Sequence, residues 1–165
     1  MYIPKRLLSA MALITFSMPF AQSQTLSPQD RNFIQDAAKG GMMEVHMGRL
    51  GAERGTSPGV KSLSQTLISD HSKANEELSS LASKKGVTLP PDDAKMVTSM
   101  PLATKHGAEF DREFARAAVE DHQKDIAAFE KEASSGSDPD VKNWAKQTLP
   151  TLQAHLSAAQ ALGKP

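Results

Sequence analysis

The sequence predicts an all-α protein: a four-helix bundle made from two duplicated helical hairpins. The first observation is an internal repeat with an offset of 81 residues, in which the Asp-Arg-x-Phe pattern at 30–33 returns at 111–114. The second is that each copy reads as helix, Gly-containing turn, Pro, helix. The third is that no β-rich alternating run is present in the chain. A single hairpin cannot bury its apolar stripe, whereas two packed hairpins form a bundle with one core.

Residues 1–23 have the pattern of a cleaved signal peptide. A basic pair at 5–6 precedes an apolar run at 7–20, which is too short to span a bilayer, and small residues lead up to Ser23. We therefore expect cleavage after Ser23, which leaves 24–165 as a single domain in the periplasm of a Gram-negative bacterium. An uncleaved membrane anchor is the alternative.

Composition narrows the function of the mature chain. The signal carries two of the 19 basic residues and no acid, so 17 Lys and Arg face 19 Asp and Glu, a net charge of −2. That balance argues against nucleic-acid binding, which needs a basic face. The chain has no cysteine, which excludes disulfides and a lipidated N-terminus. No later run approaches the roughly 20 apolar residues of a transmembrane helix, so we expect no membrane span in the mature chain.

The first hairpin is expected to consist of helices at about 28–54 and 58–85. Ser27 is a good N-cap, it is followed by Pro at the first helical position, and Gly55 can end the helix. The second helix restarts at Ser57, and its basic last turn is followed by Gly86, which is a stop signal.

The second hairpin follows a long connection at 87–105, in which one turn of helix is expected after Asp92. Helices are expected at about 108–135 and 139–162, and Pro150 inside the last one should kink it. The first and last connections between the four helices are short, and the middle one is long. This order gives a bundle with one crossover connection, the ferritin-like topology. The alternative is a plain up-down bundle in which the connection is a floppy excursion.

Four ligand-type side chains fall on or beside the inner stripes, one on each helix. At about 1.5 Å per residue they reach the same height in the bundle, where ferritin-like proteins hold metals. These candidate metal ligands are Glu44, His71, His122 and His155. Carboxylate and imidazole together favour Fe, Mn or Zn over Cu(I).

The alternative for these histidines is structural, because Asp70-His71 and Asp121-His122 form matching pairs. Such a histidine can simply bond a buried carboxylate or a carbonyl. The Glu-x-x-His motif of carboxylate-bridged di-iron bundles is absent, which argues against a di-iron oxidase and for at most a mononuclear or degenerate site.

A second candidate metal site lies in the stretch 42–47. Met42 with His46, and Met43 with Met47, are i,i+4 pairs that share a helix face. Thioether and imidazole ligands suit Cu(I), although methionine is also an ordinary gap-filler of helical cores.

Several stretches of the mature chain resemble a known bacterial family. They are Gly40-Gly41-Met42-x-Glu44-Val45, Asp70-His71-x-Lys73-Ala74-Asn75-x-Glu77-Leu78, Lys84-Lys85-Gly86-Val87-x-Leu89-Pro90, Phe129-Glu130-Lys131-Glu132-Ala133 and Thr148-Leu149-Pro150-Thr151-Leu152-Gln153-x-His155-Leu156. The family consists of exported domains of unknown function, often labelled "outer membrane protein". The resemblance covers about 28–162 and implies a ferritin-like four-helix bundle outside the cytoplasm, with no established activity.

Two functions follow as hypotheses. No nucleophile elbow, phosphate loop or His-Glu-x-x-His motif is present, which favours a non-enzymatic periplasmic binding module, acting in envelope stress or on an envelope partner protein. The alternative is metal binding or metal-dependent redox chemistry at the central belt.

Overall fold

The computed structural model describes residues 26–163, and within them the chain is all-helical with no strand. The long helices are α1 (Pro28–Arg54), α2 (Pro58–Lys85), α3 (Gly107–Ser135) and α4 (Pro139–Leu162). Two short 3-10 helices, η1 (Ala94–Ser99) and η2 (Pro101–Thr104), lie between α2 and α3. The predicted fold class, an all-α four-helix bundle, is confirmed. The predicted signal peptide lies outside the described residues.

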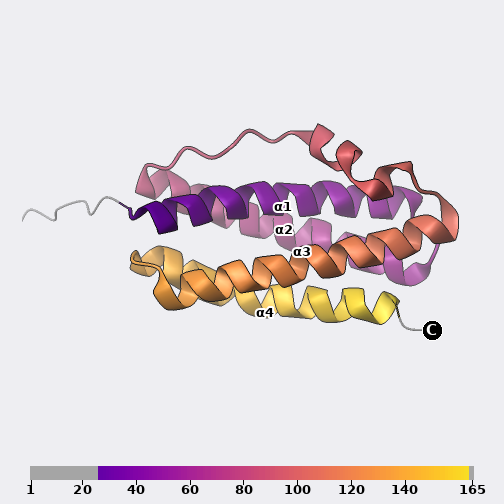
Figure 1. The fold of residues 1–165 in the computed structure, drawn as a ribbon. Helices are drawn as coiled ribbons and strands as arrows, with labels where there is room; N and C mark the ends of the chain where they lie inside the picture. Colours follow the sequence, from indigo (N-terminus) through magenta and orange to yellow (C-terminus); the bar gives the residue numbers. More distant parts are fainter. Residues whose placement is uncertain (1–25, 164–165) are drawn as a thin grey trace, which may run out of the picture.

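The helices form two antiparallel hairpins, α1–α2 and α3–α4, whose turns lie at opposite ends of the bundle (Figure 1). The connection from α2 to α3 runs the length of the bundle, as predicted for a single crossover. It is held in place rather than loose. Leu102 of η2 is fully buried, and Arg54 Nη1 donates to the carbonyl of Ala103 at 2.7 Å.

The helix ends follow the local cap chemistry of the sequence. The hydroxyls of Ser27 and Ser57 accept from the backbone N–H groups three residues on, at 3.1 and 3.2 Å. Gly86 ends α2 in the left-handed conformation, with φ of 65°, which favours glycine. α3 begins at Gly107, one residue before the expected start, and α4 continues through Pro150.

The internal repeat has a direct structural counterpart at the two turns. Asp30 of α1 accepts from the backbone N–H of Ser137 at 2.8 Å, in the α3–α4 turn. Its repeat mate, Asp111 of α3, accepts from the N–H of Thr56 at 2.9 Å, in the α1–α2 turn. Ser137 and Thr56 are themselves repeat mates at the same offset. Each hairpin therefore closes the turn of the other, as expected for two copies packed about an approximate two-fold axis.

The buried apolar side chains form two separate clusters along the bundle. One lies toward the α3–α4 turn and includes Phe33, Phe129 and Trp144; the other lies toward the α1–α2 turn and includes Leu67 and Phe114. On every long helix, the polar residue predicted at the central belt stands in sequence between members of the two clusters. The candidate site therefore interrupts the core at mid-height. No helix of the described residues is long and apolar enough to cross a membrane.

Candidate metal centre

The structure brings three of the four predicted ligands together. His71 of α2, His122 of α3 and His155 of α4 each offer a ring nitrogen, and these three nitrogens lie within 4.8 Å of one another. The residues are 5%, 0% and 2% exposed. Three nitrogens placed about 2.1 Å from one metal ion are roughly 3.5 Å apart, so only small shifts would close the set around an ion. We call these residues the His triad.

The closest approach in the His triad is between His122 Nε2 and His155 Nδ1, at 3.2 Å. On the far side of its ring, His122 Nδ1 lies 2.9 Å from the carbonyl oxygen of Ala118, one turn earlier in α3. A carbonyl can only accept a hydrogen bond, so Nδ1 carries the hydrogen and donates it. This leaves Nε2 of a neutral His122 with a free lone pair directed at His155.

His155 is fixed in the same way by a carboxylate. Its Nε2 lies 3.0 Å from Asp70 Oδ2, across the α2–α4 interface. An ionised carboxylate accepts only, so Nε2 carries the hydrogen and Nδ1 of the neutral ring has a lone pair. Two lone pairs thus face each other at 3.2 Å, an arrangement that is repulsive until a proton or a metal ion lies between them.

His71, the third member of the triad, has one ring nitrogen that makes no hydrogen bond within residues 26–163. Its Nε2 is buried and has no hydrogen-bond partner among the described residues. The His71 ring centroid lies 5.6 Å from that of His122 and 5.2 Å from that of His155. A buried imidazole nitrogen without a partner is costly unless something else binds it.

Two rings of the triad, those of His71 and His122, are held in the uncharged form. Burial, together with the neighbouring His122 and His155, lowers the pKa of His71 to about 3. Burial likewise lowers the pKa of His122 to about 4, against the opposing effect of the Ala118 carbonyl. Neutral imidazole is the form that coordinates metals, so these two ligands need no deprotonation near pH 7.

Glu44, the fourth predicted ligand, lies beside the triad and outside it. Its Oε1 is 3.6 Å from His122 Nδ1, the nitrogen that faces away from the other two rings. Glu44 is 1% exposed, and neither carboxyl oxygen has a hydrogen-bond partner among the described residues. Burial, reinforced by Asp121 and Asp125, raises its pKa well above the usual value.

Sequence reasoning missed the partner of His155. The sequence singled out Asp70 only as part of the Asp70-His71 pair, and the structure shows its carboxylate bonded to His155, 85 positions away. No local pattern could have shown this, because adjacent residues on a helix point about 100° apart. The alternative of a histidine bonded to a carbonyl or carboxylate is realised at His122 and His155. Both bonds leave the nitrogen that faces the triad free.

Two side chains of the methionine stretch have other contacts in the structure. His46 Nε2 is bonded to Asp92 Oδ1 at 2.6 Å, in the connection between α2 and α3. Met47 is fully buried in the apolar cluster near the α1–α2 turn, and Met42 and Met43 are half-buried. Met47 thus serves as a core side chain, the alternative noted for this stretch.

The triad breaks the internal symmetry of the bundle. At the repeat offset, His71, His122 and His155 correspond to Leu152, Gly41 and Ala74. The matching place in the other half is therefore closed by apolar and small residues, and Asn75 packs over Gly41. The two halves share a backbone plan, but only one side carries the ligands.

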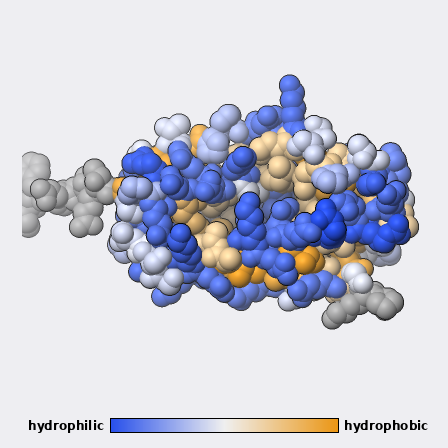
Figure 2. Space-filling view, in the orientation of Figure 1, coloured by the Kyte–Doolittle hydropathy of each residue, from blue (hydrophilic) through white to orange (hydrophobic). Residues whose placement is uncertain are grey.

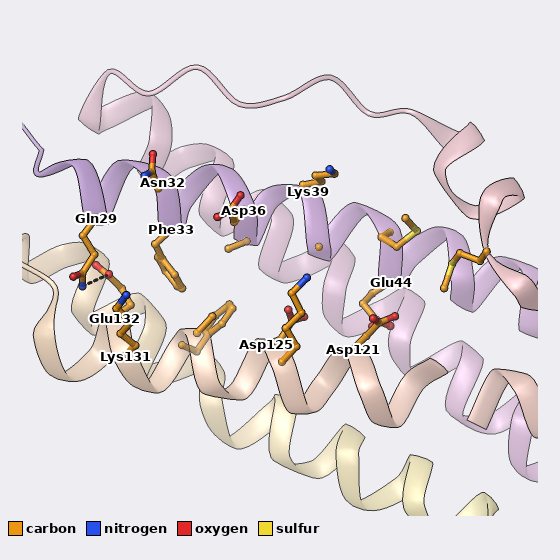
Figure 3. A pocket seen from close by; sticks show the side chains of 17 residues that line it. Gln29, Asn32, Phe33, Asp36, Lys39, Glu44, Asp121, Asp125, Lys131 and Glu132 are labelled. Carbon is orange, nitrogen blue, oxygen red and sulfur yellow. Dashed lines mark hydrogen bonds between the residues drawn. The ribbon is translucent and has the colours of Figure 1, made fainter. Parts of the chain in front are cut away.

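Two surface grooves flank the triad. Asp70 and His155 line a groove of about 570 Å³ between α2 and α4, which gives the triad a route to the outside. A second groove, of about 710 Å³, lies between α1 and α3 and is lined by Glu44, Asp121 and Asp125. On the α1–α3 face, hydrophilic side chains surround a hollow (Figure 2). The carboxylates that line this groove are shown from close by in Figure 3.

The sequence family matches most of the chain. The domain-of-unknown-function family DUF4142 matches residues 15–162. The chain belongs to the DUF4142 family. This bears out the resemblance to a family of unknown function, while the "outer membrane protein" label and the ferritin-like relationship stay predictions. No curated protein matches the chain in sequence.

Solved structures with the same fold include a DUF305 fragment and CopM. A DUF305 fragment from Deinococcus radiodurans has a TM-score of 0.71 at 17% identity and covers 84% of this chain and 97% of its own. CopM in its Cu(I)-bound form has a TM-score of 0.66 at 18% identity, covering 80% of this chain and 93% of its own. CopM in an Ag-bound form has a TM-score of 0.67 at 19% identity, covering 80% and 92%. At these identities the likeness establishes the fold alone.

Proposed function

We propose that this DUF4142 protein is a non-enzymatic metal-binding protein that holds one Cu(I) ion in the His triad. The observation that carries the proposal is the pair of lone pairs on His122 Nε2 and His155 Nδ1, 3.2 Å apart. A ring nitrogen of His71 lies in the same cluster, and the buried Nε2 of that residue has no partner among the described residues. A metal ion bound by all three nitrogens would remove the repulsion and satisfy the buried acceptors.

The charge of the site favours a monovalent ion over a divalent one. The three ligands are buried imidazoles with no carboxylate among them, and the carboxyl of Glu44 lies outside the set. Moving an ion from water into such a site costs more as its charge rises, and imidazole is a good ligand for copper. The likeness to CopM, which has been solved with Cu(I), Cu(II) and Ag, supports copper as the metal, and the choice of Cu(I) rests on the charge of the site. The earlier expectation of Fe, Mn or Zn depended on a carboxylate ligand and gains no support from these proteins.

We also propose that the protein acts outside the cytoplasm, where it would bind copper directly or pass it to another envelope protein. The support is the signal pattern of residues 1–23. Export with cleavage would leave Gln24 as the first residue. The intact mass of the protein recovered from the periplasmic fraction tests this, and a cytoplasmic full-length chain would contradict it.

Metal titration of tag-free protein tests the site. Under anaerobic conditions, Cu(I) buffered by a chromogenic chelator should bind with a stoichiometry of one. Ag(I), a redox-inert substitute, should bind in isothermal calorimetry with the same stoichiometry. The single changes His71→Ala, His122→Ala and His155→Ala should each weaken binding at least ten-fold.

Two histidines outside the triad supply matched controls. His46→Ala and the exposed His106→Ala should leave the affinity within two-fold of the wild type. Binding that persists in the His71→Ala, His122→Ala double variant would place the metal elsewhere. No binding of Cu(I) or Ag(I) by folded wild-type protein would leave the triad as a structural network.

A further inference from the structure

The groove between α1 and α3 contains carboxylates that the triad does not use. Glu44 on α1 and Asp125 on α3 are repeat mates at the offset of 81, and so are Gly40 and Asp121. Within α1, Gly40 and Glu44 are four residues apart and so share one face of the helix. Within α3, Asp121 and Asp125 share one face for the same reason. The approximate two-fold axis thus relates Glu44 to Asp125.

Glu44 provides independent evidence that something binds in this groove. It is 1% exposed, both of its oxygens are buried without a hydrogen-bond partner among the described residues, and it lines the groove. Figure 3 shows its carboxyl directed toward α3, facing Asp121 and Asp125. Three carboxylates that face one another, one of them buried and unpartnered, are unfavourable unless a proton or a cation lies between them, and a cation can replace the proton.

The local backbone leaves space for such a cation. A Cβ at Gly40 would lie 3.7 Å from both Oδ1 and Oδ2 of Asp125, so the Asp125 carboxylate already lies against the α1 backbone one turn from Glu44. Any larger side chain at residue 40 would extend into the groove. Lys39 and Lys124 also line the groove. Burial raises the pKa of Asp121 and of Asp125, and the charge of Lys124 lowers both, so the lysine offsets only part of the cost of burying these carboxylates.

We propose that the α1–α3 groove is a second cation site, which binds a hydrated divalent ion through Glu44, Asp121 and Asp125. Carboxylate oxygens are hard ligands and suit Mg²⁺, Ca²⁺ or Mn²⁺. Among residues 26–163 only the His triad brings three ligand atoms within 4.8 Å, so the carboxylates cannot all contact one bare ion as they stand. A cation that keeps some of its water bridges such a gap. This site is separate from the proposed Cu(I) site in ligand chemistry.

Mn²⁺ is the probe, because the electron paramagnetic resonance signal of the free aqua ion is lost on binding. Titration of tag-free full-length protein near pH 7.5 should show one Mn²⁺ bound, with competition by Mg²⁺ or Ca²⁺. Glu44→Gln and Asp125→Asn should each raise the dissociation constant at least ten-fold. Glu76→Gln, at an exposed position on α2, is the control and should change it less than two-fold.

Crossed variants separate the two sites. His155→Ala should keep Mn²⁺ binding, and Asp125→Asn should keep Ag(I) binding, while circular dichroism confirms that each variant is folded. Absence of Mn²⁺ binding in folded wild-type protein would overturn the groove site, as would unchanged affinity in both carboxylate variants. Loss of Mn²⁺ binding in folded His155→Ala protein would also overturn it, because the ion would then be in the triad.

Discussion

At the scale of single residues, two hydrogen bonds on the outer sides of the rings determine what the triad can do. The Ala118 carbonyl and the Asp70 carboxylate each hold the hydrogen of one ring, so that the inner nitrogens of His122 and His155 are acceptors. Such outer partners orient ligands and raise their basicity in metal sites generally. Of the two, only Asp70 is a side chain, so only it can be tested by substitution.

Asp70→Asn should weaken metal binding while all three histidines stay in place. An amide is a weaker acceptor for His155 Nε2–H and can present its NH₂ group instead, which favours the wrong tautomer. We expect Ag(I) affinity to fall about 10–100-fold, the usual effect of losing such a partner. Calorimetric titration measures it, with Glu77→Gln, at an exposed position on the same helix, as control. Equal affinities for Asp70→Asn and wild type would show that the carboxylate has no part in metal binding.

Glu44→Gln should stabilise the protein at alkaline pH. The pKa of Glu44 is raised in the fold, so between its ordinary value of about 4.5 and its folded value the folded chain holds a proton that the unfolded chain has lost. Stability therefore falls as pH rises through that window. Glutamine mimics the protonated form and avoids this loss.

Urea unfolding of wild type and Glu44→Gln at pH 4 and pH 8 measures the effect. The free energy of unfolding of Glu44→Gln minus that of the wild type should be at least about 1 kcal/mol larger at pH 8 than at pH 4. One unit of pKa corresponds to about 1.4 kcal/mol. All other titratable groups are common to the two proteins, so the comparison isolates the effect of residue 44. A variant that is less stable at pH 8 would show that Glu44 is ionised and favourably solvated.

At the scale of the elements, the two turns depend on side chains from the opposite hairpin. Asp111 accepts from the backbone N–H groups of Thr56 and Ser57 and from the Thr56 hydroxyl, at 2.9, 2.8 and 2.6 Å. These bonds lower the pKa of Asp111, against the effect of burial. Helix capping by the local sequence alone would not attach one hairpin to the other.

Asp111→Ala should therefore destabilise the bundle by about 2 kcal/mol, because charge-assisted hydrogen bonds to two backbone donors are lost. Its repeat mate variant, Asp30→Ala, should have a similar effect at the other turn. Glu109→Gln, which removes an exposed ion pair with Lys105, should cost less than about 0.5 kcal/mol. Chemical unfolding measures all three, and a loss at Asp111 no larger than at Glu109 would show that the turn bonds do not couple the hairpins.

At the scale of the whole molecule, the triad takes its ligands from both hairpins, with His71 on the first and His122 and His155 on the second. Metal bound there would link the two halves in the folded state and would be released on unfolding. The site also lies between the two apolar clusters, where the core is interrupted by polar groups. Binding and global stability should thus be coupled.

Ag(I) should raise the melting temperature. A ligand at 100 times its dissociation constant stabilises the fold by about 2.7 kcal/mol, which corresponds to roughly 5–10 °C in a domain of this size. Differential scanning calorimetry measures the shift, and it should vanish in His155→Ala and persist in His106→Ala. An equal shift in His155→Ala would indicate binding unrelated to the triad.

Local and periodic features of the sequence determined the architecture. Ser27, Ser57 and Gly86 act through their own backbone neighbours, so their cap roles can be inferred without the fold. The repeat offset predicted two packed hairpins, and the length of the connection predicted the crossover. Helical periodicity placed the three histidines on inner faces at one height, because rise per residue is nearly constant.

Only the tertiary structure decided which groups meet and in what protonation state. Periodicity gives a face and a height, but not the direction of a side chain within the belt. Glu44 therefore lies on the outer side of His122, and Asp70 bonds His155 rather than its neighbour. The neutral rings of His71 and His122 follow from their burial in the bundle, and the free lone pairs follow from acceptors on other turns and other helices. These are contacts between segments distant in sequence, which no local pattern encodes.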